Sequence, residues 1–445
     1  MAAASLGALA IIATVVVLVQ HISLRPPTTS TASPHEPLPL PDKPSIVVLP
    51  FANLSGDPGQ DYFSDGMTDG LIAQLSRTPS LFVIARSSSF TYKSKPVNVR
   101  DIGRQLGVKY VLEGSVLKAA NQVRITAQLA DTHNGAELWA QSYDRSLRDV
   151  FSTQDEIVHK ILTTLQLQLA LSQSGIPMFS FPHGTNNIEA YDYFLRSIEP
   201  YFTFTREGVN KSCEMDERAL ALDPKYVDAM WGLGFCYVTG VILGYSQNPA
   251  RDVQIASDFA KKALALDDAS PEAYYLMSQI NWVQGRDAGH VDAARRHYVQ
   301  AVDYAKRGIA LEPSNPFGYQ RLADALIPLG QPAEAVEATN KAMRLDPIGS
   351  ELYLYELGWG YTAMGRFNDA IPVLTRALIR QPENLGLHLL LTLCYSETDQ
   401  KERAMAEAAE VLQINPNFSL KMLHAGPGDR NFSHALADWR EAGLN

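Results

Sequence analysis

The sequence predicts an N-terminal α/β module with a mixed sheet in the order βαβαβββα, followed by an all-α superhelix of helix pairs. Three observations predict this architecture. Near residues 45–51 and 81–85, short apolar runs alternate with helical patterns and precede three strand patterns in succession. In the C-terminal half, similar segments recur at nearly constant spacing, which is typical of repeat proteins. An uncharged run at residues 2–19 adds one predicted N-terminal transmembrane helix.

The composition excludes several classes of protein. The 445 residues are enough for two or three domains, and 46% hydrophobic with 19% charged residues is ordinary for a globular chain. The net charge of −10, without a cluster of Lys or Arg, argues against a nucleic-acid partner. Three cysteines are too few for a disulfide framework, and Cys213 and Cys236 are interpreted as small buried thiols.

Residues 1–20 are predicted to form a membrane anchor. The run at residues 2–19 carries no charge and would span about 27 Å as a helix. A cleaved signal peptide and a buried core helix are the alternatives. A signal peptide has a basic stretch ahead of its apolar run, whereas the first basic residue here is Arg25, which follows the run. Residues 21–44 are rich in proline and predict an extended linker.

Residues 45–175 predict the α/β module. SIVVLPF at 45–51 reads as a buried strand, and Asp57-Pro58 precede a helix whose apolar residues recur at helical spacing. A second buried strand lies at 81–85, and a short helix follows, with Asn98 as its cap. The remaining elements are three strands and a closing helix, at residues 109–118, 121–130, 136–145 and 152–173. In the middle strand, apolar and polar residues alternate, which indicates a sheet with one face in water.

Residues 189–420 predict about six tetratricopeptide repeats. Related segments such as RALALDP and NKAMRLDP end at residues 224, 268, 313, 347, 382 and 416, so the last three intervals are 34 or 35 residues. A period of 34 residues is that of the tetratricopeptide helix-turn-helix, and stacked repeats form a superhelix with a concave groove. Residues 176–188 are the predicted linker, and 421–445 are a predicted C-terminal capping segment. We expect the two domains to be separable.

Aromatic residues occupy the places that face the groove in arrays resembling these repeats. In such arrays the second, fifth, ninth and twelfth residues of each first helix line the groove. Here those places hold Trp231, Phe235, Tyr275, Trp282, Phe317, Tyr355 and Trp359. Large aromatic side chains are good anchors for a protein or peptide partner. The alternative is that several of them pack between helices.

The α/β module resembles the TolB N-terminal-like (FlgO-like) domain. The resemblance rests on LPFANLSGDPGQDYFSDGMTDGLIAQLSR, VIARSSSFTYK and YVLEGSV…VRITAQLADTHNGAELWAQSYDR, three blocks in the expected order between residues 45 and about 172. In bacterial signalling proteins this domain often lies between a membrane helix and tetratricopeptide repeats, downstream of a class III adenylate/guanylate cyclase domain or a winged-helix regulator. The resemblance implies an accessory or sensory role and supplies no catalytic residues.

The sequence contains no recognisable catalytic motif. It has no H-E-x-x-H, no Cys/His set with zinc spacing, no glycine-rich phosphate loop and no nucleophile elbow. We therefore predict a non-enzymatic chain without metal, cofactor or small-molecule substrate. Ser87, Ser88 and Ser89 follow a strand and are interpreted as a turn, with a polar ligand site as the alternative.

The sequence therefore predicts a membrane-anchored signalling scaffold that binds protein or peptide partners. The alternative is the regulatory portion of a class III adenylate/guanylate cyclase-type protein whose catalytic domain is absent from this chain. Arg25 favours a cytoplasmic C-terminal side by the positive-inside rule. Resemblance to cyclase-linked proteins implies the opposite, and on that basis we predict a single-pass inner-membrane protein whose soluble part is periplasmic.

Overall fold

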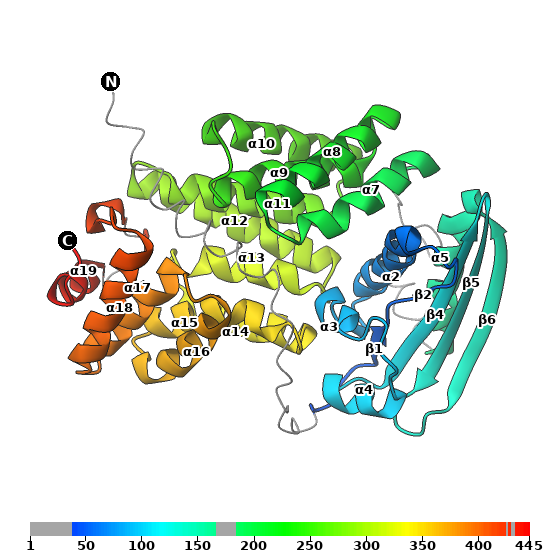
Figure 1. The fold of residues 1–445 in the computed structure, drawn as a ribbon, viewed down its shortest axis with the longest axis horizontal. Coiled ribbons are helices and arrows are strands. Elements are labelled where there is room, and N and C mark those ends of the chain that lie inside the picture. Colours follow the sequence, from blue (N-terminus) through cyan, green and yellow to red (C-terminus); the bar gives the residue numbers. More distant parts are fainter. Residues whose placement is uncertain (1–37, 166–183, 424–425, 429–431) are drawn as a thin grey trace.

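The computed structural model describes residues 38–165, 184–423, 426–428 and 432–445. The predicted anchor at 1–20 and most of both predicted linkers lie outside these ranges. Within the described part of the chain, no helix is both long enough and apolar enough to cross a membrane. Figure 1 shows the α/β module at one end of a curved array of helices.

The predicted mixed sheet is confirmed. Its strands are β1 (Ser45–Val48), β2 (Ala52–Asn53), β3 (Phe82–Val83), β4 (Tyr110–Ala119), β5 (Gln122–Asp131) and β6 (Glu137–Ser146). The order is β3-β1-β4-β5-β6, with β2 also pairing with β4. β1 runs parallel to β3 and β4, whereas β5 is antiparallel to both of its neighbours. Along β5, buried and more exposed residues alternate as predicted, so this strand has one wet face.

The helices of the module follow the predicted order with one addition. They are α2 (Asp61–Ser76), α3 (Arg86–Phe90), α4 (Val99–Leu106) and α5 (Val150–Thr164), with the short 3-10 helices η1 (Pro58–Gln60) and η2 (Leu147–Asp149). Asn98 caps α4 as predicted, because its side chain accepts a hydrogen bond from the Arg100 N–H at 2.9 Å. The interpretation of Ser87–Ser89 as a turn is wrong, since these residues lie in α3.

Six helix pairs form the superhelix, in agreement with the predicted number of repeats. They are α7 (Ile188–Tyr201) with α8 (Arg206–Leu222), α9 (Val227–Ile242) with α10 (Pro249–Leu266), α11 (Pro271–Arg286) with α12 (Val291–Leu311), α13 (Pro316–Leu326) with α14 (Pro332–Leu345), α15 (Leu354–Ala363) with α16 (Phe367–Arg380), and α17 (Leu385–Ser396) with α18 (Lys401–Ile414). Short 3-10 helices, η3 (Ser350–Tyr353) and η4 (Leu420–Met422), precede α15 and follow α18. The capping helix α19 (Phe432–Glu441) packs on α17.

Longer helices account for the two repeats with longer periods. The second helices of these repeats, α10 and α12, have 18 and 21 residues, whereas α14, α16 and α18 each have 14. Their first helices, α9 and α11, have 16 residues, against 11 in α13 and 10 in α15. The extra residues therefore extend both helices of each of these two pairs.

The module and the superhelix share their hydrophobic cores. One cluster joins residues of the sheet, α2 and α5, such as Leu71 and Ile157, to Tyr191 and Phe194 of α7. A second cluster joins the sheet and α4 to the repeat helices α13 and α14. This packing differs from the expectation of two separable domains, because separation would expose both clusters to water.

Buried polar contacts fix the same junction. The hydroxyls of Ser87 and Ser88 each donate a hydrogen bond to the carboxylate of Asp346 at 2.5 Å, and the Tyr353 hydroxyl donates to it at 3.0 Å. Asp346 follows the end of α14 and is fully buried. Nearby, the guanidinium of Arg344 donates to the carbonyls of Leu106 and Gly107 at 3.1 and 2.9 Å. The predicted turn serines are therefore part of the contact between module and repeats.

We expect the substitution Asp346→Ala to lower the free energy of unfolding by about 3 kcal/mol, because it leaves the buried hydroxyls of Ser88 and Tyr353 and the partly buried hydroxyl of Ser87 without their acceptor. Urea denaturation followed by circular dichroism would measure the change. Asp267→Ala is the matched control, since Asp267 occupies the same position after α10 and, among the described residues, its side chain accepts one hydrogen bond, the local bond from the Ala269 N–H. A loss for Asp346→Ala no larger than for the control would contradict this account of the junction.

Candidate functional site

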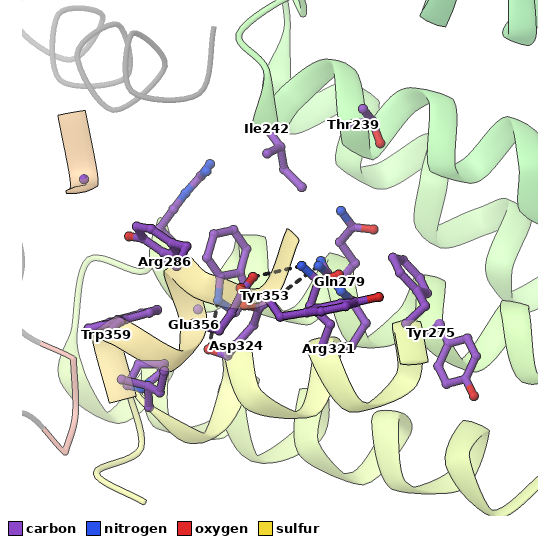
Figure 2. Close-up of a pocket in the computed structure, with 18 of the residues that line it drawn as sticks. Thr239, Ile242, Tyr275, Gln279, Arg286, Arg321, Asp324, Tyr353, Glu356 and Trp359 are labelled. Atoms are coloured by element: carbon purple, nitrogen blue, oxygen red, sulfur yellow. Dashed lines mark hydrogen bonds and ion pairs between the residues drawn. The ribbon is translucent and has the colours of Figure 1, made fainter. Parts of the chain in front are cut away.

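The concave side of the superhelix contains a cavity of about 2020 Å³, here called the groove (Figure 2). Residues from the first helix of all six pairs line it, namely from α7, α9, α11, α13, α15 and α17. Its lining also includes Asp69 and Ile72 of α2, and Arg86 and Ser87 of α3. The groove is therefore a joint product of the superhelix and the α/β module, which the sequence did not predict.

All seven predicted aromatic residues line the groove. They are Trp231, Phe235, Tyr275, Trp282, Phe317, Tyr355 and Trp359. Four of them form a continuous series of edge-to-face contacts, with ring centroids 6.0 Å apart for Trp231–Phe235, 5.7 Å for Phe235–Phe317 and 5.8 Å for Tyr275–Phe317. Tyr355 and Trp359 form a separate pair at 6.0 Å. The predicted positions thus converge on a single surface.

These aromatic residues differ in how much surface they offer. Tyr275 is only 1% exposed, and Phe235 is also buried. A Cβ atom at Gly308 would lie 2.3 Å from the Tyr275 ring, so the glycine gives this ring its place between helices. Trp231, Trp282, Phe317, Tyr355 and Trp359 are partly exposed. The alternative interpretation, packing between helices, therefore applies to Tyr275 and Phe235.

Each arginine of the groove is paired with a carboxylate and stacks on an aromatic ring. Arg321 lies 3.0 Å from Asp324, and its guanidinium carbon is 4.8 Å from the centre of the Phe317 ring. Two further sets repeat this arrangement, Arg286 with Asp287 and Trp282, and Arg86 with Asp69 and Phe202. The positive charges of the groove are thus already neutralised.

Three other carboxyl groups of the groove are buried and form no ion pair with the residues that the structure describes. Burial, followed by the charge of Glu272, raises the pKa of Glu312 to about 8, and burial with the charge of Asp324 raises the pKa of Glu356 to about 7. Burial also raises the pKa of Asp216 well above its ordinary value. These shifts follow from desolvation, which disfavours the charged form of a carboxyl group.

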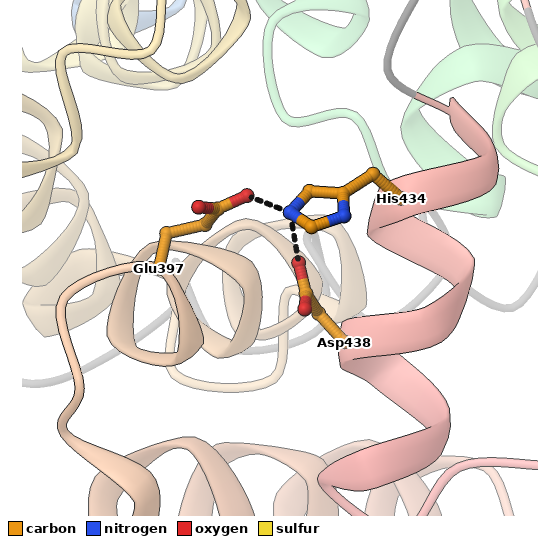
Figure 3. A group of neighbouring side chains, drawn as sticks. All are labelled: Glu397, His434 and Asp438. Carbon is orange, nitrogen blue, oxygen red and sulfur yellow. Dashed lines mark ion pairs between the residues drawn. The ribbon is translucent and has the colours of Figure 1, made fainter.

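A histidine and two carboxylates meet at the far end of the groove (Figure 3). Nε2 of His434 lies 2.9 Å from Glu397 and 3.8 Å from Asp438. The three ligand atoms lie within 4.8 Å of one another, and nitrogen with carboxylate oxygens is a donor set that suits Zn²⁺. His434 is 64% exposed, and its ion pairs already account for the arrangement. We therefore interpret the group as a contact that fastens α19 to the end of α17.

Sequence reasoning missed the part of the groove that comes from the module and from α7. Phe194 and Tyr201 of α7 line the groove, and their helical spacing was a signal that could have identified them. Arg86 and Asp69 could not have been found in this way, because they belong to another domain pattern. Cys213 and Cys236 are free thiols, of which Cys236 is buried and Cys213 is partly buried.

Comparison with known proteins confirms the repeats. Tetratricopeptide repeat families match residues 318–348 and 361–425. A protein of Rhizobium meliloti (strain 1021), named "Putative adenylate cyclase 3", is 39% identical over 264 residues, which are 59% of this chain and 44% of that protein. The chain therefore spans less than half the length of this curated relative.

Two solved structures are similar to parts of the chain. A thermophilic tetratricopeptide repeat protein of Thermus thermophilus is similar over 46% of this chain and 98% of its own, with 19% identity and a TM-score of 0.38. TolB of Acinetobacter baumannii is similar over 29% of each chain, with 18% identity and a TM-score of 0.22. The resemblance of the module to the TolB N-terminal-like domain stays a prediction.

The pKa of Glu312 predicts how stability depends on pH. Between about pH 5 and 8 the folded chain retains a proton that the unfolded chain releases, so the free energy of unfolding falls as pH rises through this window. The substitution Glu312→Gln removes this titration. The free energy of unfolding of the variant should therefore fall less steeply with pH than that of the wild type, by up to about 1.4 kcal/mol per pH unit. Urea denaturation at several pH values would measure both slopes.

Glu337→Gln serves as the control for this measurement, because Glu337 is an exposed glutamate on α14 that does not line the groove. Its curve should run parallel to that of the wild type. Parallel curves for Glu312→Gln as well would show that Glu312 is not held protonated in the folded chain.

Proposed function

We propose that this chain is a non-enzymatic scaffold that binds an extended peptide segment of a protein partner in the groove. The observation that carries the proposal is the convergence of seven aromatic residues on one surface formed by all six helix pairs. The tetratricopeptide matches support a role in protein–protein contact. Partly exposed Trp and Tyr side chains are the residue types that most often dominate binding energy at such contacts.

The size of the groove favours a polymer segment over a small molecule. Pockets for small ligands usually measure about 300–1,000 Å³. The groove is about 2020 Å³ and extends from Phe194 on α7 to Trp439 on α19. An extended peptide can contact several helix pairs at once, whereas a small ligand would fill only one part.

We further propose that the α/β module responds to what the groove binds. Asp69 and Ile72 of α2, with Arg86 and Ser87 of α3, form part of the groove wall. Ser87 also binds Asp346, so a partner that displaced α3 would act on the junction itself. An accessory or sensory role agrees with the resemblance to the TolB N-terminal-like domain.

A second candidate function is the regulatory portion of a class III adenylate/guanylate cyclase-type protein. The observation that favours it is 39% identity over 264 residues with the Rhizobium meliloti protein. In this case the catalytic region would be encoded in frame ahead of Met1. Reading the DNA upstream of Met1 distinguishes the candidates, because a cyclase-type region with two metal-binding aspartates there would replace the first proposal.

We also propose that residues 2–19 anchor the chain in the inner membrane, with the soluble part in the periplasm. The support is the uncharged apolar run, which is long enough to cross a bilayer. The chain should stay in the membrane fraction after a carbonate wash, and Ile11→Arg should release part of it, since a central Arg costs about 2.5–3.5 kcal/mol on insertion scales. A soluble product that starts near residues 33–36 would instead identify a cleaved signal peptide.

A reporter fused after Asn445 tests the orientation separately. Alkaline phosphatase activity is the expected result for a periplasmic soluble part. Cytoplasmic fluorescence without phosphatase activity would reverse the proposed orientation and leave the anchor intact.

The substitution Trp359→Ala should weaken peptide binding by about 2 kcal/mol, or roughly 30-fold, because a partly exposed Trp is a typical anchor. The peptide is first selected from a displayed random library of 12-residue peptides on the full chain and then synthesised. Fluorescence anisotropy would measure its affinity, and thermal melting would show whether the variant is folded.

Trp139→Ala is the matched control, since Trp139 is a partly exposed tryptophan on β6 outside the groove. It should leave affinity unchanged. Unchanged affinity in a well-folded Trp359→Ala variant would count against the groove as the binding site.

A further inference from the structure

The charges that line the groove are strongly unbalanced. Among its described lining residues are eight Asp and Glu residues and three Arg residues, with no Lys. The three arginines form ion pairs with Asp69, Asp287 and Asp324, with nitrogen–oxygen distances of 2.7–3.0 Å. Within the described part of the chain, the other five acids form no ion pair with these arginines, although the charge of Arg321 partly lowers the pKa of Glu356.

Asp216 is the most isolated of these groups. It is 1% exposed, and among the described residues neither of its carboxylate oxygens has a hydrogen-bond partner. The nearby hydroxyl of Ser197 donates to the carbonyl of Phe194 at 2.8 Å, and its hydrogen-bonding influence partly offsets the rise that burial causes in the pKa of Asp216. A Cβ atom at Gly232 would lie 2.7 Å from Oδ2 of Asp216, so the carboxylate packs directly on this glycine, and both residues line the groove.

Glu356 has a hydrogen-bond partner for one of its two carboxylate oxygens. It is 6% exposed, its Oε1 accepts a hydrogen bond from the Gln320 amide at 2.8 Å, and its Oε2 has no partner. Trp359 lies one turn further along α15, and both residues line the groove (Figure 2). A buried acceptor left without a donor costs free energy, so a donor brought by a ligand would be favoured here.

The arginines of the groove show which chemical group binds next to a carboxylate and an aromatic ring. Each arginine lies between a carboxylate and an aromatic ring, as Arg321 does between Asp324 and Phe317. Asp216 packs against Gly232, the neighbour of Trp231 in the chain, and Glu356 precedes Trp359 by one turn of α15, so each of these acids lies near a groove tryptophan without an ion pair to a groove arginine. Ammonium and guanidinium groups bind well between these two partners, because the ring face and the carboxylate both attract positive charge.

We propose that the groove selects a peptide segment that carries lysine or arginine side chains, with Asp216 and Glu356 as the acceptors of two of its cations. This inference rests on the proposed function and specifies the chemistry of the partner. Free polyamines share the same charged groups. The length of the groove and its aromatic surface favour a peptide, because apolar side chains between the basic ones would cover the remaining rings.

The test uses the full chain and a displayed random library of 12-residue peptides at 0.15 M NaCl. Peptides enriched on the wild type should contain more Lys and Arg than the unselected library. Replacing the basic residues of an enriched synthetic peptide by Gln should weaken its binding to the wild type at least tenfold. With the double variant Asp216→Asn, Glu356→Gln, the same replacement should change affinity less than threefold.

Two controls keep the outcome clear. Glu337→Gln removes an exposed acid outside the groove and should behave as the wild type does. The Gln-substituted peptide should bind the wild type and the double variant equally, which shows that the variant retains a folded groove. If the cost of removing the basic residues persists in the double variant, the cations bind elsewhere and the proposal is overturned.

The two proposals fail in different ways. If no enriched peptide depends on Trp359, the proposed peptide-binding function fails. If enriched peptides depend on Trp359 but are not basic, only the charge selection fails. Spermine is tested separately as a free polyamine. If spermine binds tightly to the wild type, displaces the peptide and no longer binds to the double variant, the two acids bind a free polyamine, and the proposal of a basic peptide is overturned.

Discussion

The burial of one face of the α/β module against the repeats is the constraint on which the rest of the structure depends. Two hydrophobic clusters cross this junction, and the fully buried carboxylate of Asp346 accepts hydrogen bonds from Ser87, Ser88 and Tyr353 inside it. Burying a carboxylate costs free energy, and hydrogen-bond donors around it reduce that cost. Because both sides of the contact provide them, α3 is held at the wall of the groove.

The superhelix depends in turn on close contact between helices. Small residues make that contact possible, as at Gly308 and Gly318, where the Tyr275 ring fills the space that a side chain would take. A repeat helix pair cannot bury its apolar face alone, so each pair needs its neighbours. The module at one end and α19 at the other supply the neighbours that the outermost pairs lack, and the first helices are thereby aligned along one concave surface.

That surface combines aromatic rings with acids that are kept away from water. Burial makes ionisation of Asp216, Glu312 and Glu356 unfavourable, while the arginines of the groove are already engaged by other carboxylates. A site of this kind gains most from a ligand that brings positive charge and apolar surface together. The same arrangement makes the stability of the free chain depend on pH, since protons held by these acids are released on unfolding.

Much of this protein could be read from local sequence patterns, because periodicity determines which face of an element is apolar. The alternation along β5, the Asn98 cap and the six repeats were predicted in this way, whereas the seven aromatic positions of the groove followed from the resemblance to tetratricopeptide arrays. The tertiary structure alone decided which of those rings stay exposed, and that Ser87 meets Asp346 across 259 residues of chain. No local pattern encodes such a contact, because the burial and pairing of a side chain depend on residues brought beside it only by folding.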